Sequence, residues 1–444
     1  MGQLEPALID TAATSDTVTT SHTVTTSDTV TVSPPPPGEA ASPAWWRQGY
    51  GRFLTAQGLS SVGDRVSYLV IPFCLLGVGV SPAGVAAVLG ARAVGDAMTV
   101  LYGGVLGDRL SRRKLMVTAD LTRLLTQTAA VLLVLGHRQG IASFMALQFV
   151  YGMAEALFKP AAAGMVPDLV PKSQLERANG LLGSVASTGM VTGPLIGGLL
   201  VATGLPAVGL AIDAASFLAS ALLLLGLPDG KVSSRPRRII ADLREGWRTV
   251  LDRKWLLILL TAASIFHLIS LSAVFSLGPA LASAALGGAA VWGVLVTSFG
   301  LGGIAGGFIA TRFAPARPAL VCAMLLAVLS AQPLFLASGA PIPVIAVLQF
   351  AAGMSLTIWA GVMASTCQRF VPRDALSRVA SFDEIASTSL LPLGYIMVGV
   401  LSSQIGLVTA MRTAALVAFA ICLSALFSSS IRNLRRGNEV KDET

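Results

Sequence analysis

The chain has 444 residues, of which 54% are hydrophobic and only 12% charged, and its mean hydropathy is +0.73. Soluble proteins carry about 25% charged residues, so this composition excludes an ordinary soluble domain and indicates a protein that spans a lipid bilayer. The net charge of +8 does not indicate nucleic-acid binding, because the basic residues are scattered between apolar runs and form no single patch.

The first 44 residues differ in composition from the rest of the chain. They repeat a Thr/Ser-rich hexapeptide, as in 17–22 and 23–28, and four prolines follow at 34–37. Such a segment has too few apolar residues to bury a core. It also lacks the basic region followed by an apolar region that marks a signal peptide. We therefore expect residues 1–44 to form a disordered cytoplasmic tail.

Twelve apolar stretches follow, each close to the ~20 residues that a helix needs to cross the hydrocarbon core of a bilayer. Their approximate limits are 53–78, 83–106, 115–136, 140–159, 178–203, 205–227, 255–281, 288–311, 318–338, 342–366, 380–404 and 408–431. The connections that follow even-numbered stretches are rich in arginine and lysine, whereas the connections on the opposite side offer only Arg138 and Arg412. The positive-inside rule therefore predicts an inner (plasma) membrane protein with both termini in the cytoplasm.

Two motifs recur with a constant offset of 201 residues. The segment LQFVYGM at 147–153 matches LQFAAGM at 348–354, and the pattern Val-Pro-[Lys/Arg]-x-x-Leu-x-Arg occurs at 170–177 and again at 371–378. Two separate motifs at one gapless offset indicate a duplicated chain, as transporter folds show.

The duplication sets the expected domain limits, with a polar linker between the halves. Within that linker the apolar positions of 240–251 recur at helical spacing, which predicts an amphipathic helix on the inner membrane face. The expected segments are a tail at 1–44, an N-terminal six-helix bundle at 45–227, a linker at 228–254, a C-terminal six-helix bundle at 255–431 and a cytoplasmic tail at 432–444.

A short charged turn, GGVLGDRLSRRK at 103–114, separates the second and third apolar stretches. Charge alone marks it as a cytoplasmic loop, but its spacing closely resembles the loop 2–3 signature of the major facilitator superfamily, with Ser111 where glycine is usual. The resemblance implies an all-α membrane protein with twelve transmembrane helices in two pseudo-symmetric bundles. The residues of the signature are Gly104, Leu106, Gly107, Asp108, Arg109, Ser111, Arg112 and Arg113.

The fifth stretch contains a glycine-rich motif with a proline. Taken alone it is a close-packing face, with the proline bending the helix. The full pattern also resembles the fifth-helix signature of the antiporter branch of the superfamily. Its residues are Gly189, Gly193, Pro194, Gly197 and Gly198.

Further motifs extend the resemblance over most of residues 50–430. Together they are similar to the enterobactin-exporter and macrolide-efflux group of drug:proton antiporters, which implies proton-driven export of amphipathic organic molecules. These motifs are Gln57-x-x-Ser60-x-x-Gly63-Asp64, Phe158-x-Pro160, Val170-Pro171, Ala178-Asn179-Gly180, Asp213-x-x-Ser216-Phe217 and Val371-Pro372.

Several charged side chains fall inside the predicted spans, where an unpaired charge costs about 3 kcal/mol or more. They are Asp64 and Arg65 in the first, Arg92 and Asp96 in the second, and Glu155 and Lys159 in the fourth. A proton carrier needs a pKa close to the working pH, which burial and neighbouring cations set in opposite directions. Asp64 and Glu155 are the candidate carriers, with Arg65 and Asp96 as partners in the coupling. The alternative is a permanent structural ion pair through Arg92 and Asp96.

In the superfamily's architecture, spans one, four, seven and ten line the central cavity. Spans seven and ten contain no carboxylate, so we expect the coupling chemistry in the N-terminal half. The candidate cavity residues are Gln57, Tyr68, Tyr151, Phe158, His267, Gln349 and Trp359.

The charged loop is also a candidate intracellular gate. Asp383 and Glu384 begin the eleventh stretch, where carboxylates suit a helix N-terminus. We predict that Arg109 or Arg112 pairs with one of these carboxylates when the cytoplasmic side is closed.

The sequence contains no phosphate-binding loop, catalytic triad or metal-ligand spacing, so we expect no enzymatic activity, cofactor or metal. We expect a monomeric secondary exporter whose partners are a small-molecule substrate, protons and membrane lipid. The alternatives are a siderophore exporter of the same fold or a transport-inactive scaffold or sensor.

Overall fold

The computed structural model describes residues 46–107, 111–229, 247–372 and 390–436, together with residues 375, 376, 379 and 382. The predicted tail at 1–44 and most of the predicted linker helix at 240–251 lie outside these residues. The described part of the chain is helical and contains no strand.

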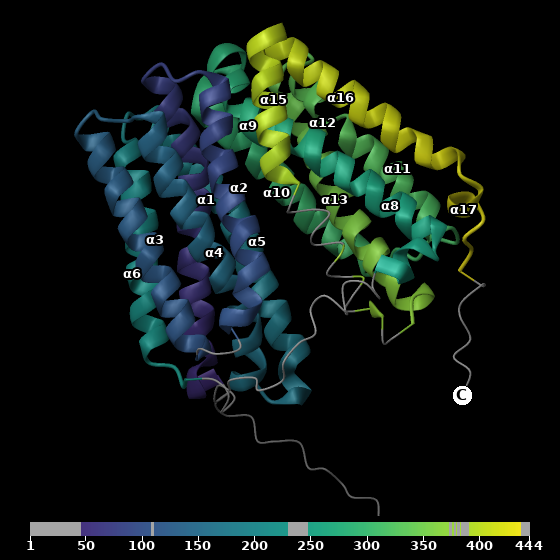
Figure 1. The fold of residues 1–444 in the computed structure, drawn as a ribbon, viewed down its shortest axis with the longest axis horizontal. Coiled ribbons are helices and arrows are strands. Elements are labelled where there is room, and N and C mark those ends of the chain that lie inside the picture. The colour runs from purple at the N-terminus through teal and green to yellow at the C-terminus, as the bar shows by residue number, and fades with distance from the viewer. Residues whose placement is uncertain are drawn as a thin grey trace, which may run out of the picture. The chain divides into compact units, whose positions relative to one another are not determined.

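The N-terminal half consists of six long helices, which Figure 1 shows gathered in one bundle. A short π-helical turn, Trp46–Tyr50, precedes the first of them, and a 3₁₀ turn, Lys172–Gln174, precedes the fifth. The helices are α1 (Gly51–Gly77), α2 (Pro82–Gly107), α3 (Arg112–Leu135), α4 (Ile141–Leu169), α5 (Leu175–Ala202) and α6 (Pro206–Leu225).

The C-terminal half forms a second group of helices, two of which are interrupted (Figure 1). The seventh predicted span is α8 (Lys254–Ile265) and α9 (Ser272–Leu281), joined and extended by the π-helical segments η3 (Phe266–Leu271) and η4 (Ala282–Leu286). The ninth breaks at Ala331, just before a Gln-Pro pair, because proline supplies no N–H for the preceding turn. The remaining elements are α10 (Gly288–Ala310), α11 (Pro318–Ser330), α12 (Gln332–Leu336), α13 (Ile342–Phe370), α15 (Leu391–Ile405), α16 (Leu407–Ser424), η5 (Ala425–Phe427) and α17 (Ser429–Arg432).

Ten helices of the described residues are long and apolar enough to cross a membrane, with Lys254–Leu286 and Pro318–Leu336 each taken as one continuous helix. The second and eleventh predicted spans are not among these ten helices. The second forms α2, which has 26 residues, and the described part of the eleventh, α15, has only 15 residues. The all-helical prediction is therefore confirmed, with helices at all twelve predicted positions and ten that meet the length and hydropathy expected of a span.

The helices α4 and α13 have matching lengths and ends, as the sequence repeat predicts. Each has 29 residues, and each continues past its predicted end, at 159 and 366. Both stop at a Val-Pro pair, where Val170 (φ −129°, ψ 134°) and Val371 (φ −113°, ψ 134°) are extended. Proline disfavours the helical conformation of the residue before it, and both helices end at this dipeptide, although α4 continues through Pro160 and Pro167.

A matching glycine brings two helices into close contact in each half. In α4, Gly152 lies against the main-chain carbonyl of Arg92 in α2, and its repeat counterpart in α13, Gly353, lies against the carbonyl of Phe299 in α10. A Cβ atom at either glycine would overlap this carbonyl group. The two crossings share one geometry, but only the first brings charged side chains together.

The two halves meet along two helix pairs. The helix α5 packs along α10, and α2 packs along α15. In the first pair, the hydroxyl of Thr297 donates a hydrogen bond of 3.0 Å to the carbonyl oxygen of Val191. These contacts position the N-terminal charges next to residues of the C-terminal half.

Candidate functional site

The guanidinium group of Arg92 is shared between two carboxylates. Its Nη2 lies 3.1 Å from Oδ1 of Asp64 on α1 and 2.8 Å from Oε2 of Glu155 on α4, and its Nε donates to the same Glu155 oxygen at 3.1 Å. The Arg92 side chain is only 11% exposed, so these charge-assisted bonds form with little competition from water. One arginine therefore joins three helices of the N-terminal half.

The ion-pair network continues along α4 to a second cation. Nζ of Lys159 lies 3.1 Å from Oε1 of Glu155 and 3.4 Å from Oδ1 of Asp96. Glu155 and Lys159 are four residues apart and so share one face of the helix. We call the connected side chains the charge network; its members are Asp64, Arg92, Asp96, Glu155 and Lys159.

Aromatic side chains surround the arginine of the charge network. The hydroxyl of Tyr151 donates a hydrogen bond to Oδ1 of Asp64, and the Arg92 guanidinium lies 4.2 Å from the centre of the Tyr151 ring. The Tyr68 ring lies 5.5 Å from the same group. Tyr68 also reaches the other half, because its hydroxyl lies 3.2 Å from that of Tyr395. The tyrosines thus connect the charges to α15 and add cation–π attraction.

The charge network opens into a cavity of about 240 Å³. Five of the residues predicted as coupling or cavity residues line it together, and the second half contributes residues from η3, α9 and α15. The lining residues are Asp64, Arg65, Tyr68, Leu89, Arg92, Ala93, Asp96, Glu155, Lys159, Leu271, Phe275, Leu391 and Tyr395.

The other predicted cavity residues lie elsewhere. Gln57 is half-buried on α1, about two turns before Asp64, and Phe158 is buried against the guanidinium of Arg123, 4.4 Å away. His267 is half-buried in η3, and its Nδ1 forms a 2.8 Å hydrogen bond with the Ala263 carbonyl oxygen. Trp359 is buried on α13. None of these side chains lines the cavity that holds the charge network.

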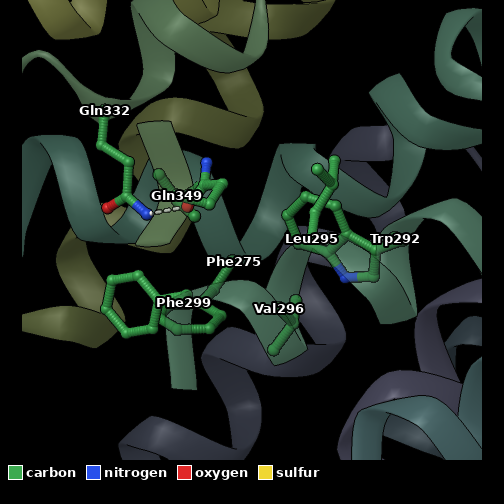
Figure 2. Close-up of a pocket in the computed structure, with 8 residues that line it drawn as sticks. Phe275, Trp292, Leu295, Val296, Phe299, Gln332 and Gln349 are labelled. Carbon is green, nitrogen blue, oxygen red and sulfur yellow. Dashed lines mark hydrogen bonds between the residues drawn. The ribbon is translucent and has the colours of Figure 1, made fainter. Parts of the chain in front are cut away.

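Gln349 lies at a much smaller cavity, of about 20 Å³, in the C-terminal half. Figure 2 shows its amide beside that of Gln332, which donates a hydrogen bond of 2.6 Å to it. The remaining lining is apolar and includes Trp292, Phe299 and Phe275. This space is about large enough for one water molecule, so it offers no room for an organic substrate.

The glycine-rich motif of α5 makes close contacts on two sides. Three of its glycines face α1, and the contacts are Gly189 with Ser61, Gly193 with Arg65 and Gly197 with Val66. Gly198 faces α10, where an added methyl group would lie 2.7 Å from the Ala289 carbonyl oxygen. The Pro194 carbonyl oxygen would lie 2.6 Å from a Cβ atom on Gly293. The motif thus packs α5 against both its own bundle and the other half.

The two gating-loop arginines that the structure describes bind within the N-terminal half. Nη1 of Arg112 lies 2.7 Å from Oδ2 of Asp168 at the end of α4. Nη2 of Arg113 lies 2.7 Å from Oδ1 of Asp229. Gly104 is in the last turn of α2. The other four predicted gate residues lie outside the described residues, so the latch between the halves stays a prediction; they are Asp108, Arg109, Asp383 and Glu384.

The sequence profile of the Major Facilitator Superfamily matches residues 53–390. The chain belongs to the major facilitator superfamily. It is therefore a multi-pass membrane transporter for small molecules.

Efflux proteins of the superfamily are among its relatives. Macrolide efflux protein A of Streptococcus pyogenes is 24% identical over 378 residues, which cover 81% of this chain and 91% of that protein. Enterobactin exporter EntS of Shigella flexneri is 32% identical over 249 residues, which cover 55% of this chain and 58% of that protein. These relatives confirm the group to which the sequence motifs point.

A solved structure of the superfamily confirms the fold. The crystal structure of nucleoside transporter NupG aligns with a TM-score of 0.66 at 13% identity, covering 85% of this chain and 97% of that one. An identity this low supports the shared fold alone and carries no information about the substrate.

A second polar group, of which only Asp213 belongs to a sequence motif named above, is buried between α1, α3 and α6. Its side chains are Ser67, Asp120, Arg123, Gln127, Asp213 and Ser220. Arg123 binds Asp120, and Gln127 donates a hydrogen bond of 2.6 Å to Asp213. The spacing of the three α3 residues, at 120, 123 and 127, places them on one helix face, and this polar stripe in an apolar stretch was a detectable signal.

Proposed function

We propose that this protein is a secondary active exporter that moves a hydrophobic or amphipathic small molecule out of the cell in exchange for protons. Its efflux-protein relatives support the direction of transport. The observation that carries the proposal is the sharing of Arg92 between Asp64 and Glu155 in a cavity lined by both halves. The cavity belongs to a single chain, which supports function as a monomer.

The charge balance of the network favours the uptake of one proton. It joins three carboxylates to two cations, so its ionised form carries one net negative charge. Arg65 also lines the cavity but is exposed and pairs with no carboxylate of the described residues. A net charge in a partly desolvated site is unfavourable, and binding one proton removes it.

Asp64 is the carboxylate that we assign as the proton carrier. Glu155 is held by both Arg92 and Lys159, so protonating it would leave two cations without this partner. Asp64 pairs with Arg92 through one bond, and its side chain is 24% exposed, compared with 19% for Glu155. When Asp64 takes a proton, Arg92 keeps its two bonds to Glu155, so the rest of the network stays neutralised.

The lining of the cavity supports a substrate with an apolar body and a basic group. Tyr68, Phe275 and Tyr395 supply aromatic surface, while the partly exposed carboxylate of Asp64 offers a partner for a basic group. A basic substrate and a proton would then compete for the same negative charge. Such competition is the physical basis of exchange, since each ligand promotes release of the other.

The contacts between the halves support a cavity that is open toward the predicted cytoplasmic side. Close contacts across the halves involve 83–90 of α2 and 190–198 of α5, which lie toward the helix ends remote from the loop at 108–110. With the positive-inside orientation, this arrangement corresponds to an inward-open conformation with cytoplasmic termini. The predicted latch of Arg109 or Arg112 with Asp383 or Glu384 would form in the alternate, outward-open conformation.

Transport by the purified protein in liposomes tests the proposal. A panel with a basic macrolide, a neutral apolar drug and a catecholate siderophore would be driven by an imposed pH gradient, with proton movement followed by a pH-sensitive dye. We expect movement of the basic compound in wild type, and loss of pH-driven transport together with weaker binding of the basic compound in Asp64→Asn. The matched control is Asp252→Asn, an exposed carboxylate outside the cavity, which should transport like wild type.

The other outcomes discriminate between the alternatives. Transport of the siderophore alone would favour a siderophore exporter and contradict the charge argument. Wild-type exchange by Asp64→Asn would remove Asp64 as the carrier. If no compound moves in the wild type, the exporter proposal fails in favour of a scaffold or sensor.

A further inference from the structure

Asp213, in the middle of α6, is a fully buried carboxyl group without a countercharge. Its exposure is 0%, and its Oδ2 accepts a hydrogen bond of 2.6 Å from Nε2 of Gln127. Its Oδ1 has no hydrogen-bond partner among the described residues, and neither does Oε1 of Gln127. The hydroxyl of Ser67, beside this pair, accepts a hydrogen bond of 3.2 Å from the same Gln127 nitrogen. The polar side chains next to the Asp213 carboxyl group, those of Gln127 and Ser67, are therefore neutral.

A second buried carboxylate in the same bundle shows the contrasting arrangement. Asp120, on α3, is also 0% exposed, but it pairs with Arg123 and accepts a hydrogen bond of 2.6 Å from the hydroxyl of Ser220. A carboxylate removed from water needs such a cation to remain ionised. Asp213 forms no ion pair with any described lysine or arginine, because Arg92 and Arg123 pair with other carboxylates.

The carboxyl group of Asp213 packs against α1, the helix that carries the proposed proton carrier Asp64. Its Oδ1 would lie 2.8 Å from a Cβ atom on Gly63, the neighbour of Asp64 in α1. The glycine thus lets the Asp213 carboxyl group reach the α1 backbone, one residue from the cavity-facing aspartate. The charged and titratable groups that interact electrostatically with Asp213 are Asp64 on α1, Arg92 on α2, Arg123 on α3 and Tyr151 on α4.

We propose that Asp213 is a second proton-binding site, occupied in this conformation and linked to Asp64 through α1. The proton resides on the unpartnered oxygen, Oδ1, and Oδ2 continues to accept the bond from Gln127. The carboxylates of Asp64 and Asp213 lie on different sides of α1 and repel each other when both are ionised. The proton on Asp213 therefore stabilises the ionised Asp64 that binds Arg92, and loss of that proton favours protonation of Asp64. This linkage rests on the proposed proton exchange, whereas the protonation of Asp213 does not.

Infrared spectroscopy of the purified protein in detergent tests the protonation directly. At neutral pH, Asp213→Asn should remove a carboxylic acid carbonyl band from the wild-type spectrum, whereas Asp120→Asn should leave that band in place. If Asp213→Asn removes no such band, Asp213 is ionised and the proposal is wrong. This reading requires no substrate and no transport.

Thermal unfolding distinguishes a protonated Asp213 from an ionised one by a second route. Asparagine has nearly the same shape as a neutral aspartic acid, so Asp213→Asn should unfold at a temperature close to that of wild type. Asp120→Asn should unfold at a clearly lower temperature, because it leaves Arg123 buried without its partner. Equal destabilisation of the two variants would contradict the difference in protonation.

The pH dependence of transport tests the linkage to Asp64. With a permanently neutral residue at position 213, the ionised form of Asp64 is no longer repelled by a second carboxylate, so protonating Asp64 requires a lower pH. The plot of pH-driven transport rate against pH should therefore shift toward lower pH in Asp213→Asn. An unchanged profile would show that Asp213 is a fixed structural acid and would overturn the linkage. If the wild type transports nothing, the exporter proposal fails, while the infrared result still decides whether Asp213 binds a proton.

Discussion

Replacing Arg92 by leucine should strongly destabilise the N-terminal half. The arginine side chain is 11% exposed and forms three hydrogen bonds to two carboxylates. Its removal leaves Asp64 with the hydroxyl of Tyr151 and Glu155 with Lys159. Removing one partner of a buried ion pair costs about 3–5 kcal/mol, so we expect Arg92→Leu to lower the free energy of unfolding by this amount.

Arg92→Lys should have a smaller effect, of about 1–3 kcal/mol, because one charge-assisted hydrogen bond contributes about that much. A lysine ammonium keeps the positive charge but lacks the planar fork that binds Asp64 and Glu155 together. It also loses the guanidinium contact to the Tyr151 ring, at 4.2 Å. The order of stability should therefore be wild type, then Arg92→Lys, then Arg92→Leu.

Chemical denaturation of the purified protein in detergent, followed by tryptophan fluorescence, measures these differences. The double variant Arg92→Leu with Asp64→Asn should recover part of the loss, since it no longer leaves Asp64 as a carboxylate without its cation. If Arg92→Leu unfolds within about 0.5 kcal/mol of wild type, as surface substitutions usually do, the shared arginine contributes no net stability and the reasoning is refuted.

Two further predictions concern glycine contacts. Gly152→Ala should lower the free energy of unfolding by up to about 2 kcal/mol, because overpacking against the Arg92 carbonyl costs about 1–3 kcal/mol and the gain in helix propensity returns about 1 kcal/mol. Its control in the same denaturation assay is Gly183→Ala, where no atom lies within 4 Å of the added methyl group; equal stability of the two variants would contradict the packing argument. Gly198→Val should weaken the contact with Ala289 and reduce the inward-open population. Distances between spin labels on α5 and α10 would report this change, and an unaltered distance distribution would count against it.

The sequence by itself determined the all-helical fold class and the positions of the apolar helices. Membrane spans are recognised because an apolar run of sufficient length must satisfy its own backbone hydrogen bonds in lipid. The ends of α4 and α13 coincide with the matching Val-Pro pairs at Val170 and Val371, where the proline disfavours the helical conformation of the valine. The repeated motifs likewise indicated a duplicated chain, and the repeated residues lie in corresponding helices, α4 and α13.

Only the tertiary structure decided which charges meet. Helical spacing placed Asp64 and Tyr68 on one face of α1, but the partner of that face depends on how α2 crosses α4, which Gly152 permits. The crossing makes Arg92 the shared cation. It also lets Glu155 pair with two cations, Arg92 and Lys159, whereas Asp64 pairs with Arg92 alone. A linear sequence specifies the faces of each helix, whereas the rotation and crossing of helices arise from contacts between residues far apart in the chain. For that reason the lack of an ion pair between Asp213 and any described lysine or arginine is visible only in the folded protein.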